Sequence, residues 1–445
     1  MIMNTTENNK NGSGGKFFKS VSFKLFVIVS LSLLMLIPTI FIRNLINERQ
    51  GRRDETIAEV TSKWGEEQQI FGPVLIVPYE KIEFISKGKY SRYLHYFHIL
   101  PDELNLTAQI APEIRYRGIY EVIIYGSDIE ISGRFKAESF SDWPDNPDKI
   151  LWEDAKLVVG ISDLTGLDAV RSLAWNETSL SAEGGIPYNS SLTGGIHTSV
   201  KVDTENDNEF GINLSLNGSE SISIVPAGKT SRVQMASSWP DPSFTGSSLP
   251  DEREVTVNGF TAEWESMHLT RPFPQKWSDN NYSDEIAESA FGVDLFIPVD
   301  IYQKTTRSVK YALLFIGLTF LVIFFIEMIS KQRIHPVQYL LAGTALVVFY
   351  SLLLALSEHL NFALAYLISS VSIVTIIAGY ASSIFKQRKF AIITVVVLVA
   401  LYTFLYTILQ MSDYALLLGN IGLVVIVAIV MFFSRKIEWY NESNS

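Results

Sequence analysis

The sequence predicts a membrane protein of six transmembrane helices, with a large, mainly β extracytoplasmic domain inserted between helix 1 and helix 2. Three observations support this fold class. Six apolar stretches are each long enough to cross a bilayer, whose hydrocarbon core needs about 20 helical residues. The segment between the first two stretches is acidic and rich in strand-forming residues. Lys and Arg gather in alternate turns of the later stretches, as in chains that cross a membrane repeatedly.

The charge of the chain is divided between two unlike parts. Residues 43–310 hold 25 Lys and Arg against 41 Asp and Glu, a net charge of −16, whereas the rest of the chain carries +5. A part of this size can bury a hydrophobic core of its own. Its acidity disfavours nucleic acid as a partner, because that binding rests on cationic contacts. The chain has no Cys, which excludes disulfides, thiolate metal sites and Cys nucleophiles.

The N-terminal region predicts a polar cytoplasmic tail over residues 1–24 and transmembrane helix 1 over residues 25–42. A cleaved signal peptide is the alternative. The apolar run is long for such a peptide, and Phe41, Ile42 and Arg43 stand where a small-x-small cleavage site would be needed. An uncleaved anchor helix is therefore expected.

Residues 43–310 predict a mainly β periplasmic domain that begins with a stalk helix. The stretch from Leu45 to Ile70 is charged and has apolar residues at a helical period. Gly72-Pro73 is expected to end that helix. A helix lying on the membrane surface is the alternative, although its mixed charge suits anionic lipid poorly.

Strand signals dominate from Val74 to Gln303, and they predict a sandwich-like domain or one large twisted sheet. Ile212 and Leu214 alternate with polar residues, as a half-buried strand requires. Asn217-Gly218 then predicts a hairpin turn. The expected elements are strands at Val74–Pro78, Tyr93–Leu100, Leu104–Ile110, Ile119–Ile131, Lys156–Ile161, His197–Val202, Phe210–Leu216, Ser219–Val225, Ser231–Met235, Glu254–Val257 and Phe291–Ile301, and a short helix at Glu285–Ala290.

Residues 311–436 predict a five-helix transmembrane bundle, and residues 437–445 a second cytoplasmic tail. Stretches of this length must be helical in lipid, because an open backbone would leave polar groups unsatisfied. The five expected spans are Tyr311–Ile329, Val337–Leu356, Phe362–Ala381, Phe390–Gln410 and Tyr414–Phe433.

The short turns of the bundle predict its orientation. The turns after the third and fifth spans carry acidic residues and no Lys or Arg. By the positive-inside rule the basic turns and both termini are cytoplasmic, which places the β domain outside the cytoplasm. The cations follow the second, fourth and sixth spans at Lys331, Arg333, Lys386, Arg388, Lys389, Arg435 and Lys436.

Several motifs together closely resemble the CreD-type inner-membrane proteins of Gram-negative bacteria, over about residues 20–435. The resemblance implies a role in cell-envelope integrity and, in some bacteria, a link to a two-component response to envelope or β-lactam stress. It implies no catalytic residues. The residues that carry it are Trp64-Gly65, Phe71-Gly-Pro-Val-Leu-Ile-Val-Pro-Tyr79, Arg115-Tyr-Arg-Gly-Ile-Tyr-Glu-Val122, Ser238-Trp-Pro-Asp-Pro-Ser-Phe244, Pro298-Val-Asp-Ile-Tyr-Gln303 and the hairpin Lys331–Tyr366.

No motif predicts a catalytic residue, a cofactor or a metal site. Ala227-Gly-Lys-Thr230 lacks the first Gly of a phosphate-binding loop and is expected to be a β-turn. The acidic run 203–209 lacks the Gly and Glu of a Ca²⁺ loop and predicts a solvated hairpin turn. His95 and His98 are an odd number of residues apart in a strand, so they should face opposite sides.

Four polar residues at membrane depth or edge are the candidate functional residues: Glu327, His335, Glu358 and His359. A charge within lipid costs about 3 kcal/mol on insertion scales, so such residues usually face a partner or a cavity. They either lie at the interfaces, where snorkelling makes them inexpensive, or form a functional cluster. Glu327 and Glu358 are expected near opposite faces of the membrane and therefore not in one compact site.

The function expected from these features is a multi-pass envelope protein that binds or senses rather than catalyses. Its partners would be the lipid bilayer and a periplasmic protein or envelope glycan, and the sequence does not specify its oligomeric state. A transporter or lipid-handling protein is one alternative. A membrane-proximal, envelope-modifying enzyme using Glu358 and His359 as acid or base is the other.

Overall fold

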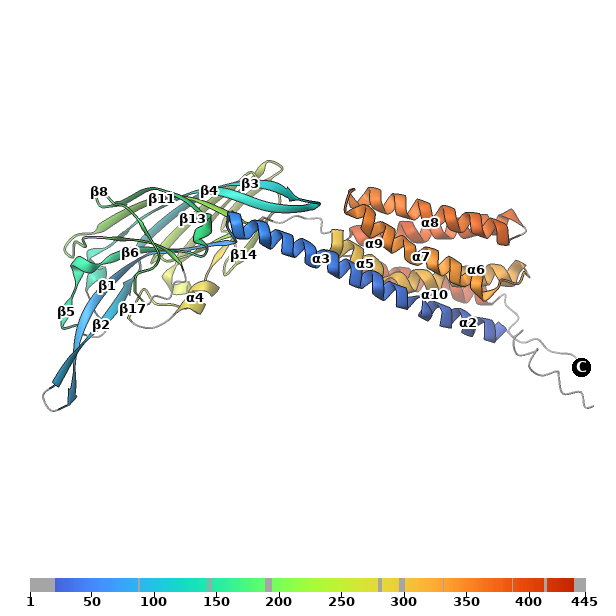
Figure 1. The fold of residues 1–445 in the computed structure, drawn as a ribbon, viewed down its shortest axis with the longest axis horizontal. Helices are drawn as coiled ribbons and strands as arrows, with labels where there is room; N and C mark the ends of the chain where they lie inside the picture. The colour runs from blue at the N-terminus through green and yellow to red at the C-terminus, as the bar shows by residue number, and fades with distance from the viewer. Residues whose placement is uncertain are drawn as a thin grey trace, which may run out of the picture. The chain divides into compact units, whose positions relative to one another are not determined.

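The computed structural model describes residues 21–86, 89–141, 143, 146–188, 194–278, 282–295, 301–330, 332–385, 387–411 and 414–435. The chain forms a helical unit, Met1–Arg52 with Val299–Ser445, and a β unit, Arg53–Pro298 (Figure 1). The boundaries predicted at 43 and 310 mark where the chain is expected to leave the membrane. The two compact units instead divide at Arg52, within the helix Leu36–Trp64, and at Pro298, before the helix Ile301–Lys310. Residues 1–20 of the expected N-terminal tail, and all of the C-terminal one, lie outside the described residues.

The helical unit confirms the membrane-helical part of the fold class. Five helical segments in the described part of the chain are long and apolar enough to span a membrane, and α10 holds a shorter apolar stretch, Leu417–Phe432. The first segment runs from Phe23 to Trp64. The helices are α2 (Val21–Leu34), α3 (Leu36–Trp64), α5 (Ile301–Lys310), α6 (Ala312–Ser330), α7 (Pro336–Ser357), α8 (Phe362–Ile384), α9 (Arg388–Gln410) and α10 (Ala415–Ser434).

Helix α5 is a short amphipathic helix within residues that were predicted to end the β domain. Tyr302, Thr305 and Val309 are buried, and this spacing places them on one face of the helix. The helix packs against α6, α7 and α9. It therefore belongs to the helical unit.

The predicted stalk helix ends earlier than expected. Helix α3 stops at Trp64, and strand β1 begins at Gln68 and contains Gly72-Pro73. The reason lies at Gly65, whose φ of +142° is one that side chains rarely allow, and where an added Cβ would lie 2.6 Å from the Asn217 carbonyl oxygen. A close backbone approach, and not the later Gly-Pro pair, therefore ends this helix.

The β unit is a sandwich of a ten-stranded and an eight-stranded sheet. The main path of the ten-stranded sheet is β14-β18-β12-β1-β6-β10-β9, with β2, β5 and β17 attached at its side. Its strands are β1 (Gln68–Ser86), β2 (Lys89–Ile99), β5 (Lys149–Ile150), β6 (Lys156–Ile161), β9 (Glu183–Gly184), β10 (Gly195–Ser199), β12 (Ser221–Val225), β14 (Pro242–Gly246), β17 (Lys276–Ser278) and β18 (Phe291–Leu295); a short helix, α4 (Ser283–Glu288), precedes β18.

The eight-stranded sheet has the order β15-β16-β13-β3-β4-β11-β7-β8. It is built around the long β3–β4 hairpin, and the β3–β13 pair is parallel while its other pairs are antiparallel. The strands are β3 (Glu103–Arg117), β4 (Tyr120–Phe135), β7 (Leu167–Trp175), β8 (Thr178–Ser179), β11 (Asn208–Ser219), β13 (Thr230–Ser237), β15 (Glu252–Thr256) and β16 (Gly259–Met267).

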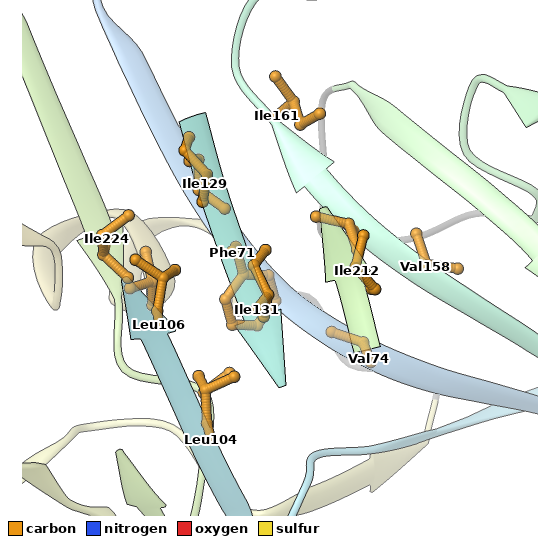
Figure 2. Packing of buried hydrophobic residues seen from close by; sticks show 14 of the residues in the cluster. Phe71, Val74, Leu104, Leu106, Ile129, Ile131, Val158, Ile161, Ile212 and Ile224 are labelled. Atoms are coloured by element: carbon orange, nitrogen blue, oxygen red, sulfur yellow. The ribbon is translucent and has the colours of Figure 1, made fainter. Parts of the chain in front are cut away.

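The core of the β unit lies between the two sheets. Phe71 and Val158 of the ten-stranded sheet belong to the same buried cluster as Leu106, Ile131 and Ile212 of the eight-stranded sheet, as Figure 2 shows. In strands β3 and β4 of the eight-stranded sheet such residues alternate with exposed ones, as the two-residue period of a strand requires, whereas β1 and β6 are buried at successive positions around Phe71 and Val158. Each fully buried aliphatic or aromatic side chain contributes about 1.5–3 kcal/mol relative to an exposed one.

The predicted Asn217-Gly218 hairpin turn is wrong. Strand β11 continues through both residues to Ser219, and they pair with Gly126 and Tyr125 of β4. Gly218 serves close packing here, because a Cβ at that position would lie 2.3 Å from the Tyr125 hydroxyl oxygen. The chain instead turns at Glu220, where φ is +59°, and β12 joins the other sheet.

Candidate functional site

Glu327 is the centre of a buried polar cluster in the helical unit. It lies in the last turn of α6, and its side chain is 2% exposed. Lys24 Nζ of α2 donates to Glu327 Oε1, and so does the Ile334 backbone N–H, at 3.0 Å. The Tyr339 hydroxyl of α7 donates to Oε2 at 3.0 Å. Both carboxylate oxygens are therefore satisfied.

This inner cluster joins three parts of the helical unit. Removing a carboxylate from water costs several kcal/mol, and only good geometry with additional hydrogen bonds offsets that cost. Lys24, which is 31% exposed, supplies the opposite charge, and Tyr339 and Ile334 supply the remaining donors. The arrangement holds α2 against α6 and the start of α7.

Glu358 forms a second cluster at the other end of α7, where it is the residue after the helix. The Tyr302 hydroxyl of α5 donates to Glu358 Oε1 at 3.3 Å. Arg49 of α3 lies 3.8 Å from Oε2, and the carboxylate side chain is 8% exposed while the Arg49 side chain is 39% exposed. This outer cluster is looser and more hydrated than the inner one.

The two candidate histidines are exposed and belong to helix ends. His335 is the N-cap of α7: its Nδ1 accepts from the Val337 N–H at 3.3 Å, while its own N–H donates to Gln338 Oε1 at 3.0 Å. This is a capping box: it satisfies the backbone N–H groups of His335 and Val337, which the helix itself leaves unpaired. The His359 N–H donates to the Leu356 carbonyl in the turn after α7. His335 thus stabilises the start of α7.

The two glutamates do not share a site. Helix α7 has 22 residues and is about 33 Å long, and the two clusters lie at its opposite ends. His359 follows Glu358 in the chain, but its side chain is exposed, and the contacts of Glu358 within the described residues are with Tyr302 and Arg49. The expected separation of Glu327 and Glu358 is therefore confirmed.

Sequence reasoning missed the partners of both glutamates. Lys24 directly precedes the first apolar stretch and Arg49 follows it by seven residues, so a carboxylate near either end of another span was a candidate partner for each. Tyr302 and Tyr339 gave a weaker signal, since tyrosines are common at both membrane interfaces.

The motifs that resembled chemical sites have structural roles in the β unit. The 227–230 loop connects β12 to β13, which lie in different sheets, and the Lys229 N–H donates to the Pro101 carbonyl. Asp203 closes the acidic turn by accepting from the Glu205 and Asn206 N–H groups. This turn also joins two sheets, β10 to β11, so the predicted hairpin there is wrong.

The histidine pair in β2 packs against aromatic rings. His98 stacks on Trp277 with ring centroids 5.0 Å apart, and His95 stacks on Tyr79 at 5.3 Å. Within the described residues, no group of three His, Asp or Glu side chains could hold a metal ion.

Together, the fold and the two ion-paired clusters define a multi-span helical membrane protein that carries a large β-sandwich. The sequence profile described as "Inner membrane protein CreD" matches residues 20–440. The chain is 32% identical over 425 residues to the protein of that name from Escherichia coli strain K12, covering 94% of this chain and 93% of the relative. The chain belongs to the CreD family of inner membrane proteins.

Proposed function

We propose that this protein contributes to envelope integrity or to a stress response by binding or sensing, without catalysis. In this proposal the β unit lies in the periplasm, where it contacts a protein or an envelope glycan, and both termini lie in the cytoplasm. The basic turns support that orientation, since Arg333 and Arg388 lie at one end of α7 and α8 in sequence, and Glu358 and Asn361 at the other.

The observation that carries the proposal is one nearly continuous helical segment that belongs to both units. It runs from Phe23 to Trp64. Inside the helical unit Lys24 holds it to Glu327, and Arg49 approaches Glu358. Inside the β unit the Trp64 indole N–H donates to the Tyr125 carbonyl at 3.2 Å. In this proposal the helix, held by these contacts within each unit, carries a change from one unit to the other.

The orientation is tested by thiol labelling, which the absence of native Cys makes specific. Asn206→Cys places a thiol in the exposed acidic turn of the β unit, and Gln387→Cys places one in a basic turn. A membrane-impermeant maleimide added to intact spheroplasts should label only the first variant. Labelling of Gln387→Cys alone would overturn the proposed orientation.

Transmission through the helix is tested by changing its phase. At Gly51 an added Cβ would meet no atom within 4 Å, so extra residues after it would meet little steric resistance. Two inserted residues rotate the following helix by about 200°, whereas seven complete about two turns and restore its phase.

The readout is survival of envelope stress by cells that depend on this protein. We expect the two-residue insertion to abolish protection and the seven-residue insertion to retain most of it, at equal protein levels in the membrane. If both insertions protect as well as the parent, the helix is a simple tether and the transmission proposal fails.

A further inference from the structure

The eight-stranded sheet carries a polar furrow on the face that points away from the core. Its volume is about 860 Å³. It crosses seven of the eight strands, because its lining comes from β15, β16, β13, β3, β4, β11 and β7. The furrow lies within the β unit and is separate from both glutamate clusters.

The strand register shows how this furrow is built. One cross-strand row contains, in order, Glu254, Thr261, Ala236, Gln109, Asp128, Ser215 and Ala169, each directly opposite the next. With about 4.8 Å between strands, six steps span about 29 Å. The row therefore presents polar groups on five of these seven strands, with Ala236 and Ala169 at the other two positions.

Small residues form the floor of the furrow. In a neighbouring row on the same face, Ala111 pairs with Gly126, and Gly126 pairs with Asn217. Long side chains such as Gln109 and Glu254 are exposed beside it, while the aromatic ring of Phe260 is buried beneath. The furrow thus forms where the outward-facing side chains are short.

Asp128 has two polar partners at the centre of the furrow. Arg171 lies 2.6 Å from Asp128 Oδ1, with both side chains more than half exposed, and the hydroxyl of the buried Ser215 donates to the same oxygen at 2.8 Å. The carboxylate is therefore partly neutralised while it stays accessible to a ligand.

The lining combines hydrogen-bond donors and acceptors in similar measure. Its exposed groups are hydroxyls of Thr and Ser, amides of Gln and Asn, carboxylates and one guanidinium. Sugar hydroxyls both donate and accept, so they match such a surface. The lining holds three carboxylates, at positions 128, 168 and 254, and one Arg, and this excess of negative charge disfavours nucleic acid.

We propose that this furrow binds a linear glycan that lies across the strands. The inference rests on the proposed function, because it names the class of ligand that the β unit would recognise. The two can fail separately: the helix-phase experiment uses no ligand, and glycan binding to purified protein does not depend on transmission.

The experiment measures binding to the full-length protein in lipid nanodiscs by calorimetry. The probes are chitohexaose, which carries N-acetyl groups as wall glycans do, maltohexaose, which is a plain glucan, and hexalysine. At least one hexasaccharide should bind, and which one binds identifies the type of glycan. If neither binds, or if only hexalysine binds, the proposal is overturned.

Matched variants locate the binding. Ala111→Trp fills the floor from an exposed position of β3 and should weaken hexasaccharide binding at least about tenfold. Asn105→Trp adds the same ring to the same face of β3, outside the furrow, and should leave binding unchanged.

A variant with a smaller side chain guards against misfolding. Gln109→Ala only truncates an exposed side chain of the furrow, so it should fold even if Ala111→Trp does not. We expect it to weaken hexasaccharide binding several-fold with an unchanged melting temperature. If Gln109→Ala and a folded Ala111→Trp both bind like the parent, the glycan lies elsewhere and the furrow proposal is wrong.

Discussion

The inner and outer clusters of the helical unit each provide partners for a glutamate carboxylate. In each, a glutamate near one end of α7, Glu327 of α6 or Glu358, meets a cation from the N-terminal helical segment and a tyrosine hydroxyl. Glu327 is almost fully buried and also accepts a backbone N–H. Glu358 is 8% exposed and has longer contacts, and the two cations are similarly exposed, Lys24 at 31% and Arg49 at 39%. The inner cluster is thus only slightly less exposed than the outer one, and it differs mainly in having shorter and more numerous contacts.

The largest expected effect is at the inner cluster. Glu327→Ala leaves Lys24, Tyr339 and the Ile334 N–H without their acceptor. The cost should be about 3 kcal/mol, the lower end for breaking a buried ion pair, because Lys24 is 31% exposed. Glu358→Ala is the matched control and should cost about 1 kcal/mol, because Arg49 lies 3.8 Å from the carboxylate and is 39% exposed. The measurement is the free energy of unfolding in mixed micelles titrated with SDS. Equal losses for both variants would contradict the comparison.

The second prediction isolates the ion pairs from the other contacts. A double-mutant cycle of Lys24→Ala with Glu327→Ala should give a coupling energy of about 1.5–3 kcal/mol, near the upper end for residues in contact. The corresponding cycle of Arg49→Ala with Glu358→Ala should give less than about 1 kcal/mol. If the outer pair couples as strongly as the inner one, contact distance does not govern these interactions.

The third prediction compares the two tyrosine hydroxyls. Tyr339→Phe removes a 3.0 Å hydrogen bond to the buried carboxylate and should destabilise the protein by about 1.5–3 kcal/mol. Tyr302→Phe removes a longer, 3.3 Å bond and should cost about 0.5–1 kcal/mol. Both substitutions preserve the ring, so a difference in unfolding free energy reports the hydroxyl. Equal losses would contradict the expected difference between the hydroxyls, and a larger loss for Tyr302→Phe would show that the outer cluster is the tighter one.

The architecture was predictable because its signals are long and redundant. Apolar stretches as long as 337–356 predict transmembrane helices. Strand β6 begins and ends at the residues predicted from the sequence, Lys156 and Ile161. Strand β16 was missed although Phe260, Ala262 and Trp264 are buried at alternating positions. The polar residues between them are what a half-buried strand requires, so the two-residue period was present in the sequence and could have predicted this strand.

What the sequence could not supply was contact between distant residues. Asn217-Gly218 reads locally as a turn, yet the pairing of β11 with β4 and the ring of Tyr125 decide its conformation. Glu327 needed a partner, but Lys24 lies 303 residues away. Likewise, the furrow depends on the register of seven strands, which no local pattern encodes.

The smallest expected effect concerns a third carboxylate, Asp163 of the β unit. Partial burial raises its pKa, but hydrogen bonds from the Glu66 and Thr165 backbone N–H groups lower that pKa by more, so it lies below the ordinary 3.8. Because the folded-state pKa is below the unfolded one, the stabilisation is present above pH 3.8 and is lost as pH falls through the folded-state pKa.

Asp163→Asn should therefore destabilise the protein slightly at pH 6 and by progressively less as the pH falls below about 3.8. The measurement is the difference in unfolding free energy between parent and variant across that range. Asp54→Asn is the control, because Asp54 is exposed and forms its ion pair with the adjacent Arg53. The Asp163 carboxylate remains hydrated, so its loss should be smaller than that of Glu358. A loss as large as that of Glu327 would mean that backbone hydrogen bonds stabilise a carboxylate as strongly as burial with a cation.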